Sequence, residues 1–388
     1  MRLTVLVNAG PWLPVPPRDY GGIENVLGTL IARLRRRGVR VVLCGVGSST
    51  IEVDRLVASF PDGQFRWLAA PYNQVMGIAY AHMQTVVAEL CRAADIDVVH
   101  DHLEVVGPGT LSLLGARFPP VLQTLHWDVR KHPDFYGRFN GAGRTFFACV
   151  SERQRELAPE NLRRQVLGVV PLGVEPAGFP FRRCKPGPYL MLARVCPLKG
   201  QHVAARVCRG LRLPLLLAGP VAGFADAASL AAADDGTGEG AGGNADVRYF
   251  RTRVAPLLGG DVRWVGSVGG RRRLELLSRA RAALFPAQWE EPGGTAVLEA
   301  LACGTPVVGF RRGCLPELVQ HGVTGFLADS EEEFAGYLPR ADEIDPAACR
   351  RVVEERFSAE LMAGTCGCTR RCSAAPSGGR RASRRLPG

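Results

Sequence analysis

Short runs of apolar residues alternate along the chain with longer stretches in which apolar residues recur at helical spacing. Residues 3–8 form such a run and predict a buried strand. Residues 24–37 have the helical pattern and predict a helix that Gly38 ends. The same reasoning predicts strands over residues 39–44, 97–100, 121–126, 146–150 and 166–170. Continuously apolar strands separated by helices indicate a parallel sheet that is covered on both faces.

The pattern starts again after residues 172–180. Strands are predicted over residues 189–193, 214–218, 262–266, 282–285 and 305–309, with a helix over 200–209. We therefore predict an α/β protein with two Rossmann-like, doubly wound domains, 1–172 and 173–362, and a basic, disordered tail over 363–388. Ligands of such sheets bind at the carboxyl ends of the strands, which places the site in a central cleft. Residues 221–246 are rich in Ala, Gly and Asp and are predicted to form a flexible insertion.

The composition is that of a globular protein, with 46% hydrophobic and 22% charged residues among 388. The longest nonpolar run, residues 213–225, is too short and too interrupted by proline and glycine to cross a bilayer. The first apolar run stops at Asn8, so it predicts a core strand and no secretory signal. We expect a cytoplasmic protein whose contact with membranes is at most peripheral.

The formal net charge of +11 suggests nucleic acid, but its distribution argues against such a partner. Six of the eleven excess positive charges lie in residues 361–388, so the rest of the chain is nearly neutral. A basic tail can bind anionic polymers or lipid head groups, and the simpler interpretation is a solvated, disordered end.

The twelve cysteines lie mostly in apolar stretches and are expected to be reduced core thiols. Cys366, Cys368 and Cys372 do not have the spacing of zinc ligands. In a strand, His100 and His102 would point away from Asp101, so this triplet is a weak metal site as well. We expect no metal.

The most specific segment contains Glu291 and Glu299, which are eight positions apart, with a Pro-Gly-Gly turn after Glu291. Gly294 or Thr295 is predicted to begin a helix that ends at Gly304. The first N–H groups of that helix would favour an anion. One carboxylate near a bound nucleotide can accept both hydroxyls of a ribose, and another can accept hydroxyls of a sugar.

Three further segments carry candidate chemistry. Arg194 and Lys199 follow a predicted strand, and two cations at this spacing suit a diphosphate. Lys199 is one of only three lysines against 45 arginines. Gly21 and Gly22 open the first predicted helix and offer N–H groups to an anion or a sugar. His126 lies at the end of a predicted strand.

In this order, the motifs resemble those of the family-4 glycosyltransferases of the GT-B fold, retaining enzymes that use nucleotide sugars. The resemblance covers roughly residues 1–360. The segments 98–102 and 313–317 are similar to the actinobacterial branch that includes glycosyltransferases of orthosomycin (avilamycin-type) antibiotics.

The resemblance implies a role for several candidate residues in the second half of the chain. Arg194 and Lys199 would neutralise the donor diphosphate. Glu299 would hold the nucleotide ribose, Glu291 would contact hydroxyls of the donor sugar, and the main chain at Val268 would meet the base.

It also implies that Gly294 and Thr295 contact a phosphate, that Gly21 and Gly22 approach the donor phosphates, and that His126 lies beside donor sugar and acceptor. The catalytic set would be His126, Arg194, Lys199 and Glu291. Transfer of a hexose to a natural product, lipid or saccharide hydroxyl would then need no metal and no cofactor besides the nucleotide-diphosphate sugar.

Departures from the family pattern are visible as well. Gly293 stands where an aromatic residue usually follows Glu-Pro, so a looser loop is expected. Ala193 replaces the glycine before Arg194. Residues 347–362 are expected to begin the helix that crosses back to the first domain, but the tail after it is unlike the family's.

Two other functions remain open. A nucleotide-sugar epimerase would bind the same donor and change it without an acceptor, and a degenerate relative would bind nucleotide without catalysis. A dinucleotide oxidoreductase is disfavoured, because the first strand is not followed by the glycine fingerprint of that class.

Overall fold

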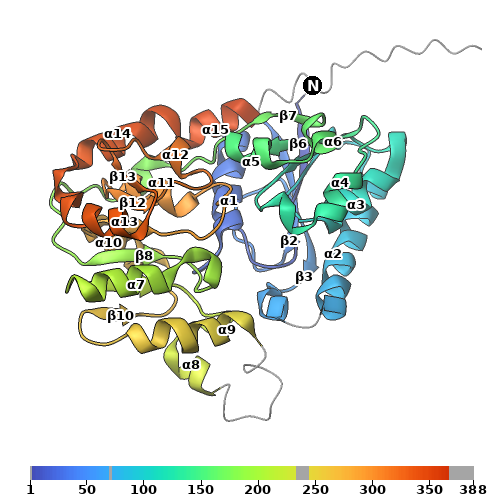
Figure 1. The fold of residues 1–388 in the computed structure, drawn as a ribbon. Helices are drawn as coiled ribbons and strands as arrows, with labels where there is room; N and C mark the ends of the chain where they lie inside the picture. The colour runs from blue at the N-terminus through green and yellow to red at the C-terminus, as the bar shows by residue number, and fades with distance from the viewer. Residues whose placement is uncertain (1, 70–71, 233–243, 367–388) are drawn as a thin grey trace, which may run out of the picture.

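The computed structural model describes residues 2–69, 72–232 and 244–366, which fold around two parallel sheets (Figure 1). The first sheet has the strand order β3-β2-β1-β4-β5-β6-β7. Every pair of neighbouring strands in it is parallel. Its strands are β1 (Thr4–Asn8), β2 (Arg40–Val46), β3 (Arg55–Phe60), β4 (Val98–Asp101), β5 (Val121–Thr124), β6 (Thr145–Cys149) and β7 (Val166–Val169).

The second sheet has the order β10-β9-β8-β11-β12-β13 and is also parallel throughout. Its strands are β8 (Tyr189–Leu192), β9 (Leu215–Ala218), β10 (Val262–Trp264), β11 (Ala283–Phe285), β12 (Val307–Phe310) and β13 (Gly325–Ala328). Two doubly wound α/β halves were predicted, and the architecture is confirmed. The boundary at residues 172–173 stays a prediction.

Helices connect the strands and cover the sheets. Those of the first half are α1 (Gly22–Arg36), α2 (Tyr72–Arg92), α3 (Val106–Leu111), α4 (Pro133–Arg138), α5 (Glu152–Leu157) and α6 (Glu160–Arg163). Those that follow are α7 (Gln201–Gly210), α8 (Ala227–Ala232), α9 (Ala245–Tyr249), α10 (Gly270–Arg279), α11 (Thr295–Ala302), α12 (Leu315–Leu318), α13 (Glu331–Tyr337), α14 (Pro346–Arg356) and α15 (Ala359–Cys366). None of the helices in the described ranges is long and apolar enough to span a bilayer.

Two strands escaped the sequence pattern. β3 lies at the edge of the first sheet, and none of its residues is fully buried, so it lacks a continuous apolar run. β13 is buried but only four residues long, and it begins at Gly325. A Cβ at Gly325 would lie 1.9 Å from the carbonyl oxygen of Val307 in the neighbouring strand, so this position admits only glycine.

The segment 221–246 is more ordered than expected where the structure describes it. Val221 is fully buried and pairs with Val195 and Phe224, and α8 and α9 follow. Residues 233–243 lie outside the described part. The ten cysteines in the described ranges are unpaired, and eight of them are buried.

The last helix crosses back to the first half of the molecule (Figure 1). α15 packs against α1, and Glu360 forms ion pairs with Arg33 and Arg37 of the first half. Ala363 is fully buried in this contact region. Residues 363–366 therefore belong to a packed helix rather than to the tail predicted from residue 363, and the remainder of that tail, 367–388, lies outside the described residues.

Candidate active site

A cavity of about 90 Å³, partly open to solvent, lies where the carboxyl ends of the second sheet face the start of α1. Loops after β8, β9 and β10 and the first turns of α11 form one side, and the loop before α1 forms the other. Five predicted site residues line it: Gly21, Gly22, Val268, Thr295 and Glu299. This position is the one expected for a ligand of a doubly wound sheet.

The glycine pair before α1 has two distinct roles. A Cβ at Gly21 would lie 2.7 Å from Pro17 and 2.9 Å from Glu24 Oε2, so packing within the loop requires this glycine. A Cβ at Gly22, the first residue of α1, would meet nothing within 4 Å. Packing within the fold therefore does not require a glycine at position 22. The missing side chain instead leaves free space beside the cavity, which Gly22 lines.

The loop before α1 also brings Tyr20, which the sequence analysis missed, into the cavity. Desolvation raises the pKa of the Tyr20 hydroxyl, and the nearby cations Arg194 and Lys199 oppose the rise. Both predicted cations therefore lie close enough to the same hydroxyl to act on it electrostatically. This shared neighbour links Arg194 and Lys199 to the cavity, although neither residue lines it.

Each predicted cation is held by a carboxylate. Lys199 Nζ lies 2.5 Å from Glu291 Oε2, which also accepts a hydrogen bond of 3.0 Å from the indole N–H of Trp289. Glu291 raises the pKa of Lys199 in spite of desolvation, which acts in the opposite direction. Arg194 forms a 3.0 Å ion pair with Asp246 of α9. The predicted catalytic pair Lys199 and Glu291 is thus in direct contact.

The helix predicted after Glu291 is α11, with Gly294 as its N-cap. Gly294 has φ +60°, a left-handed conformation that favours glycine, and a Cβ there would lie 2.8 Å from Leu318 and 3.0 Å from the Cys314 sulfur. The fold alone therefore accounts for glycine at this position. The first N–H groups of α11 lack intrahelical acceptors and point away from the helix, and Thr295 lines the cavity.

Glu299, one turn inside α11, is buried and paired with a residue that the sequence analysis missed. Arg273 of α10 places its Nη1 2.5 Å from Glu299 Oε2, and both side chains line the cavity. Burial raises the pKa of Glu299, and Arg273 opposes the rise. The run of three arginines at residues 271–273 was visible in the sequence, but only packing distinguishes Arg273 from the others.

The expectation of a loose loop at Gly293 is wrong. A Cβ at this position would lie 2.6 Å from Leu172 and 3.1 Å from Val150, both of which come from the first half of the chain. Gly293 is buried, so the loop between Glu291 and α11 packs directly onto the first half. The loop is held by this contact and has no room for an aromatic side chain.

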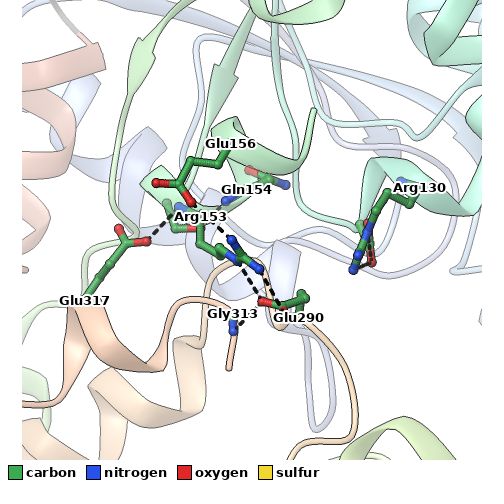
Figure 2. A network of polar contacts seen from close by, with 9 residues as sticks. Arg130, Arg153, Gln154, Glu156, Glu290, Gly313 and Glu317 are labelled. Atoms are coloured by element: carbon green, nitrogen blue, oxygen red, sulfur yellow. Dashed lines mark hydrogen bonds and ion pairs between the residues drawn. The ribbon is translucent and has the colours of Figure 1, made fainter. Parts of the chain in front are cut away.

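A polar network beside Glu291 joins the two halves, and Figure 2 shows its members. Arg153 of α5 donates from Nε to Glu290 Oε2 at 3.0 Å, and the N–H of Gly313 donates to the same oxygen at 2.9 Å. Glu317 of α12 accepts the N–H groups of Glu152 and Arg153 at 2.9 Å each. The hydrogen bond from Arg153 lowers the pKa of Glu290. Sequence reasoning missed these residues.

His126 lies in the first half, two residues after β5 ends at Thr124. Its Nε2 is 2.8 Å from Nδ1 of His102, and the two rings are stacked with centroids 5.1 Å apart. Burial lowers the pKa of His126 to about 3, so the ring is neutral at physiological pH. Among the residues that the structure describes, no hydrogen bond or ion pair joins His126 to the other predicted site residues.

The triplet His100-Asp101-His102 is committed to hydrogen bonds. His100 Nε2 lies 2.8 Å from the Thr124 hydroxyl, and Asp101 accepts from the side-chain amides of Asn8 at 2.7 Å and Gln123 at 3.0 Å. Burial raises the pKa of Asp101 to about 7. Within residues 2–69, 72–232 and 244–366 no group of three His, Cys, Asp or Glu side chains could hold a metal ion.

Two family models match the chain, one for each half. Residues 20–177 match Glycosyltransferase Family 4, and residues 185–352 match Glycosyl transferases group 1. Glycogen synthase of Mycobacterium tuberculosis is 28% identical over 277 residues, which cover 66% of this chain and 62% of that protein. The match thus spans less than two thirds of that curated relative.

Solved structures are similar over almost the whole chain. AviGT4, a glycosyltransferase involved in avilamycin A biosynthesis, is 27% identical with a TM-score of 0.67, covering 96% of this chain and 99% of its own. Anabaena HepE in complex with UDP-glucose has the same fold at 16% identity, with a TM-score of 0.65 and coverage of 95% and 100%. With both halves matched, the chain belongs to the glycosyltransferases of family 4 and group 1.

Proposed function

We propose that this glycosyltransferase moves a hexose from a nucleoside-diphosphate sugar to a hydroxyl acceptor, with retention at the anomeric carbon and without a metal ion. The observation that carries the proposal is the shared cavity, in which the Gly22 end of α1, the Thr295 end of α11 and the carboxylate of Glu299 face one space. The HepE structure, which has the same fold, holds UDP-glucose and supports such a donor.

The base and ribose of the donor would lie in this cavity, with the diphosphate and sugar towards Lys199 and Glu291. Val268 and Ser267 would meet the base, and Glu299, oriented by Arg273, would accept the ribose hydroxyls. The diphosphate would lie between Gly22 and the first N–H groups of α11, since both offer unpartnered N–H groups and little side-chain bulk. Arg194 and Lys199, next to Tyr20, would approach it from the loop after β8.

The charge arrangement suits departure of a nucleoside diphosphate. When the anomeric C–O bond breaks, negative charge grows on the leaving phosphate, and positive groups placed there lower the barrier. Lys199 is held by Glu291 before the donor arrives. Donor binding would give Lys199 a phosphate partner and free Glu291 to accept hydroxyls of the sugar.

Retention follows if the acceptor attacks the face from which the phosphate leaves. A departing phosphate oxygen then takes the proton of the acceptor hydroxyl, so no carboxylate has to form a covalent sugar intermediate. His126 would contact the donor sugar and the acceptor. The acceptor itself would be a hydroxyl of a small natural product, a saccharide or a lipid.

The direct test offers UDP-, GDP- and dTDP-hexoses to the purified full chain, with EDTA present. A matching donor at about 100 times its Kd adds about 2.7 kcal/mol to stability and raises the unfolding midpoint. Release of the nucleoside diphosphate with sugar transfer to an acceptor supports the proposal. A changed nucleotide sugar without acceptor would indicate an epimerase, and binding without sugar release would indicate a degenerate relative.

A further inference from the structure

The neighbour of His126 is fixed by the sheet itself. β4 and β5 are adjacent and parallel, with Asp101 opposite Gln123, so the loops that leave their carboxyl ends lie side by side. His102 is the first residue after β4, and its N–H donates to the carbonyl of Asn8 at 3.0 Å. This hydrogen bond fixes the backbone of His102 beside the loop that carries His126.

His102 is almost completely enclosed, with 3% of its surface exposed. Its Nδ1 contacts His126 Nε2 at 2.8 Å, whereas its Nε2 is buried and has no hydrogen-bond partner within the described residues. The ring of His100 also lies close, 4.2 Å away between centroids, and is itself bonded to Thr124. His102 thus packs against two imidazoles.

These contacts favour one tautomer. Burial lowers the pKa of His102 well below its ordinary value, so the ring is neutral and carries a single proton. A proton on Nε2 would be a buried donor without an acceptor, which is costly. A proton on Nδ1 is donated to His126, and only a lone pair is left unpaired.

The tautomer of His102 determines that of His126. If His126 accepts at Nε2, its own proton must be on Nδ1, because this ring is neutral too. His126 is partly exposed, and Nδ1 forms no hydrogen bond within the described residues. The proton of His126 is therefore left for a ligand.

We propose that His102 is a positioning residue that fixes the ring and the tautomer of His126, so that His126 presents its Nδ1–H as a hydrogen-bond donor to a hydroxyl oxygen of the sugar or acceptor. This inference rests on the proposed function. It assigns His126 the role of donor and not of base, because its Nε2 lone pair is already used. The proton of the acceptor then has to leave on the phosphate.

The test combines NMR with kinetics on the full chain labelled with ¹⁵N in its seven histidines. Long-range ¹H–¹⁵N spectra report which ring nitrogen of His126 carries the proton. The wild type is expected to show Nδ1–H. His102→Leu should shift His126 toward Nε2–H and lower kcat roughly 10- to 100-fold, while the KM of the donor changes less than about twofold, since orientation is lost and donor binding is kept.

Two further variants separate positioning from general damage. His102→Asn places an amide near the position of Nδ1, so it should restore the Nδ1–H tautomer and most of kcat. His82→Leu removes another buried imidazole, one that is bonded to Asn8 and not to His126. It should lower stability and leave the tautomer of His126 and kcat unchanged.

Each result decides the matter. A wild-type His126 protonated on Nε2, or a tautomer that His102→Leu leaves unchanged, overturns the inference, and the wild-type spectrum gives this answer even if the Leu variant fails to fold. A tautomer that changes as expected in a chain that transfers no sugar would support the inference and contradict the proposed function.

Discussion

The two halves of the molecule contribute differently to the candidate site. The second half supplies ions in pairs, Lys199 with Glu291 and Arg273 with Glu299. The first half contributes the backbone at Gly22 and the side chain of Tyr20 to the cavity, and it holds the partly exposed, neutral ring of His126. Under the proposed function, the second half would stabilise the leaving diphosphate and the first half would orient the sugar.

The largest expected effect comes from removing a charge in the second half. Lys199→Ala should lower kcat about 10²- to 10³-fold, or about 3 to 4 kcal/mol of barrier, because a preorganised cation is lost where negative charge develops. Steady-state assays with the cognate donor measure it. Lys131→Ala is the matched control, since Lys131 is a half-exposed lysine paired with Glu104. Unchanged turnover in Lys199→Ala would remove the role of this residue.

The second effect is a dependence of stability on pH that arises in the first half. Burial lowers the pKa of His82 and His100 to about 4 and of His126 to about 3, and that of His102 falls as well. Below about pH 6.5 these histidines bind protons in the unfolded chain but remain neutral in the folded chain. The free energy of unfolding therefore falls as the pH falls.

Buried carboxyls act in the opposite direction, and two of them titrate near neutral pH. Burial raises the pKa of Glu24 and Asp101 to about 7, so the folded chain takes up their protons first as pH falls. Near pH 5 the four histidines outnumber them by about two protons, so stability should fall there by roughly 2 to 3 kcal/mol per pH unit, and by less near pH 6.5, where the histidines of the unfolded chain are only half protonated. Urea unfolding measures this slope. His82→Gln removes one of the four histidines and should reduce the slope by about 1.4 kcal/mol per pH unit near pH 5. A wild-type free energy of unfolding that does not change with pH would contradict the prediction.

The third effect separates the two glycines of the first half. Gly22→Ala should leave folding intact, since its Cβ has free space, but should weaken donor binding about tenfold, or 1.4 kcal/mol, by keeping the phosphate away from the backbone. Gly21→Ala should instead destabilise the fold through Pro17 and Glu24. Calorimetric titration of donor and thermal unfolding distinguish them, with Gly336→Ala in α13 as a control. Unaltered affinity in Gly22→Ala would place the phosphate elsewhere.

The smallest effect concerns the polar contact between the halves. Arg153→Ala removes the side-chain link to Glu290, which precedes Glu291. Because the pair is partly exposed, a rise of only about two- to fivefold in the KM of the donor is expected, with kcat nearly constant. Arg155→Ala, whose partner Glu152 lies on the same helix, should change neither value. A large fall in kcat would show that Arg153 acts on the reacting atoms.

The fold could be predicted further than the site. Continuous apolar runs identified most strands of both sheets, but β3 at an exposed edge left no such signal. Gly21, Gly22, Val268, Thr295 and Glu299 were expected near one ligand, and they line one cavity. The partner of each charge was not predictable. Asp246 and Arg273 are far in sequence from Arg194 and Glu299, and only tertiary packing brings them within reach.

His102 illustrates the same limit. The His-x-His pattern was evident and was weighed as a metal site, but the residue that pairs with His102 comes from the loop that follows the next strand in the sheet. Gly293 is a second case. The absence of a side chain suggested a loose loop, whereas the close packing of Leu172 from the first half leaves no room for a side chain at this position. Periodicity identifies elements, and contacts between elements decide what their residues do.

α1 has a consequence for protein engineering. It spans 15 residues, or about 22 Å at 1.5 Å per residue, with Gly22 at one tip and Arg33 and Arg37, the anchors of α15, near the other. A fluorophore at exposed Leu361 of α15 would therefore lie beside the end of α1 that is opposite Gly22. Such a label would test whether donor binding at one end of α1 is sensed at the other, and it leaves every residue of the cavity untouched.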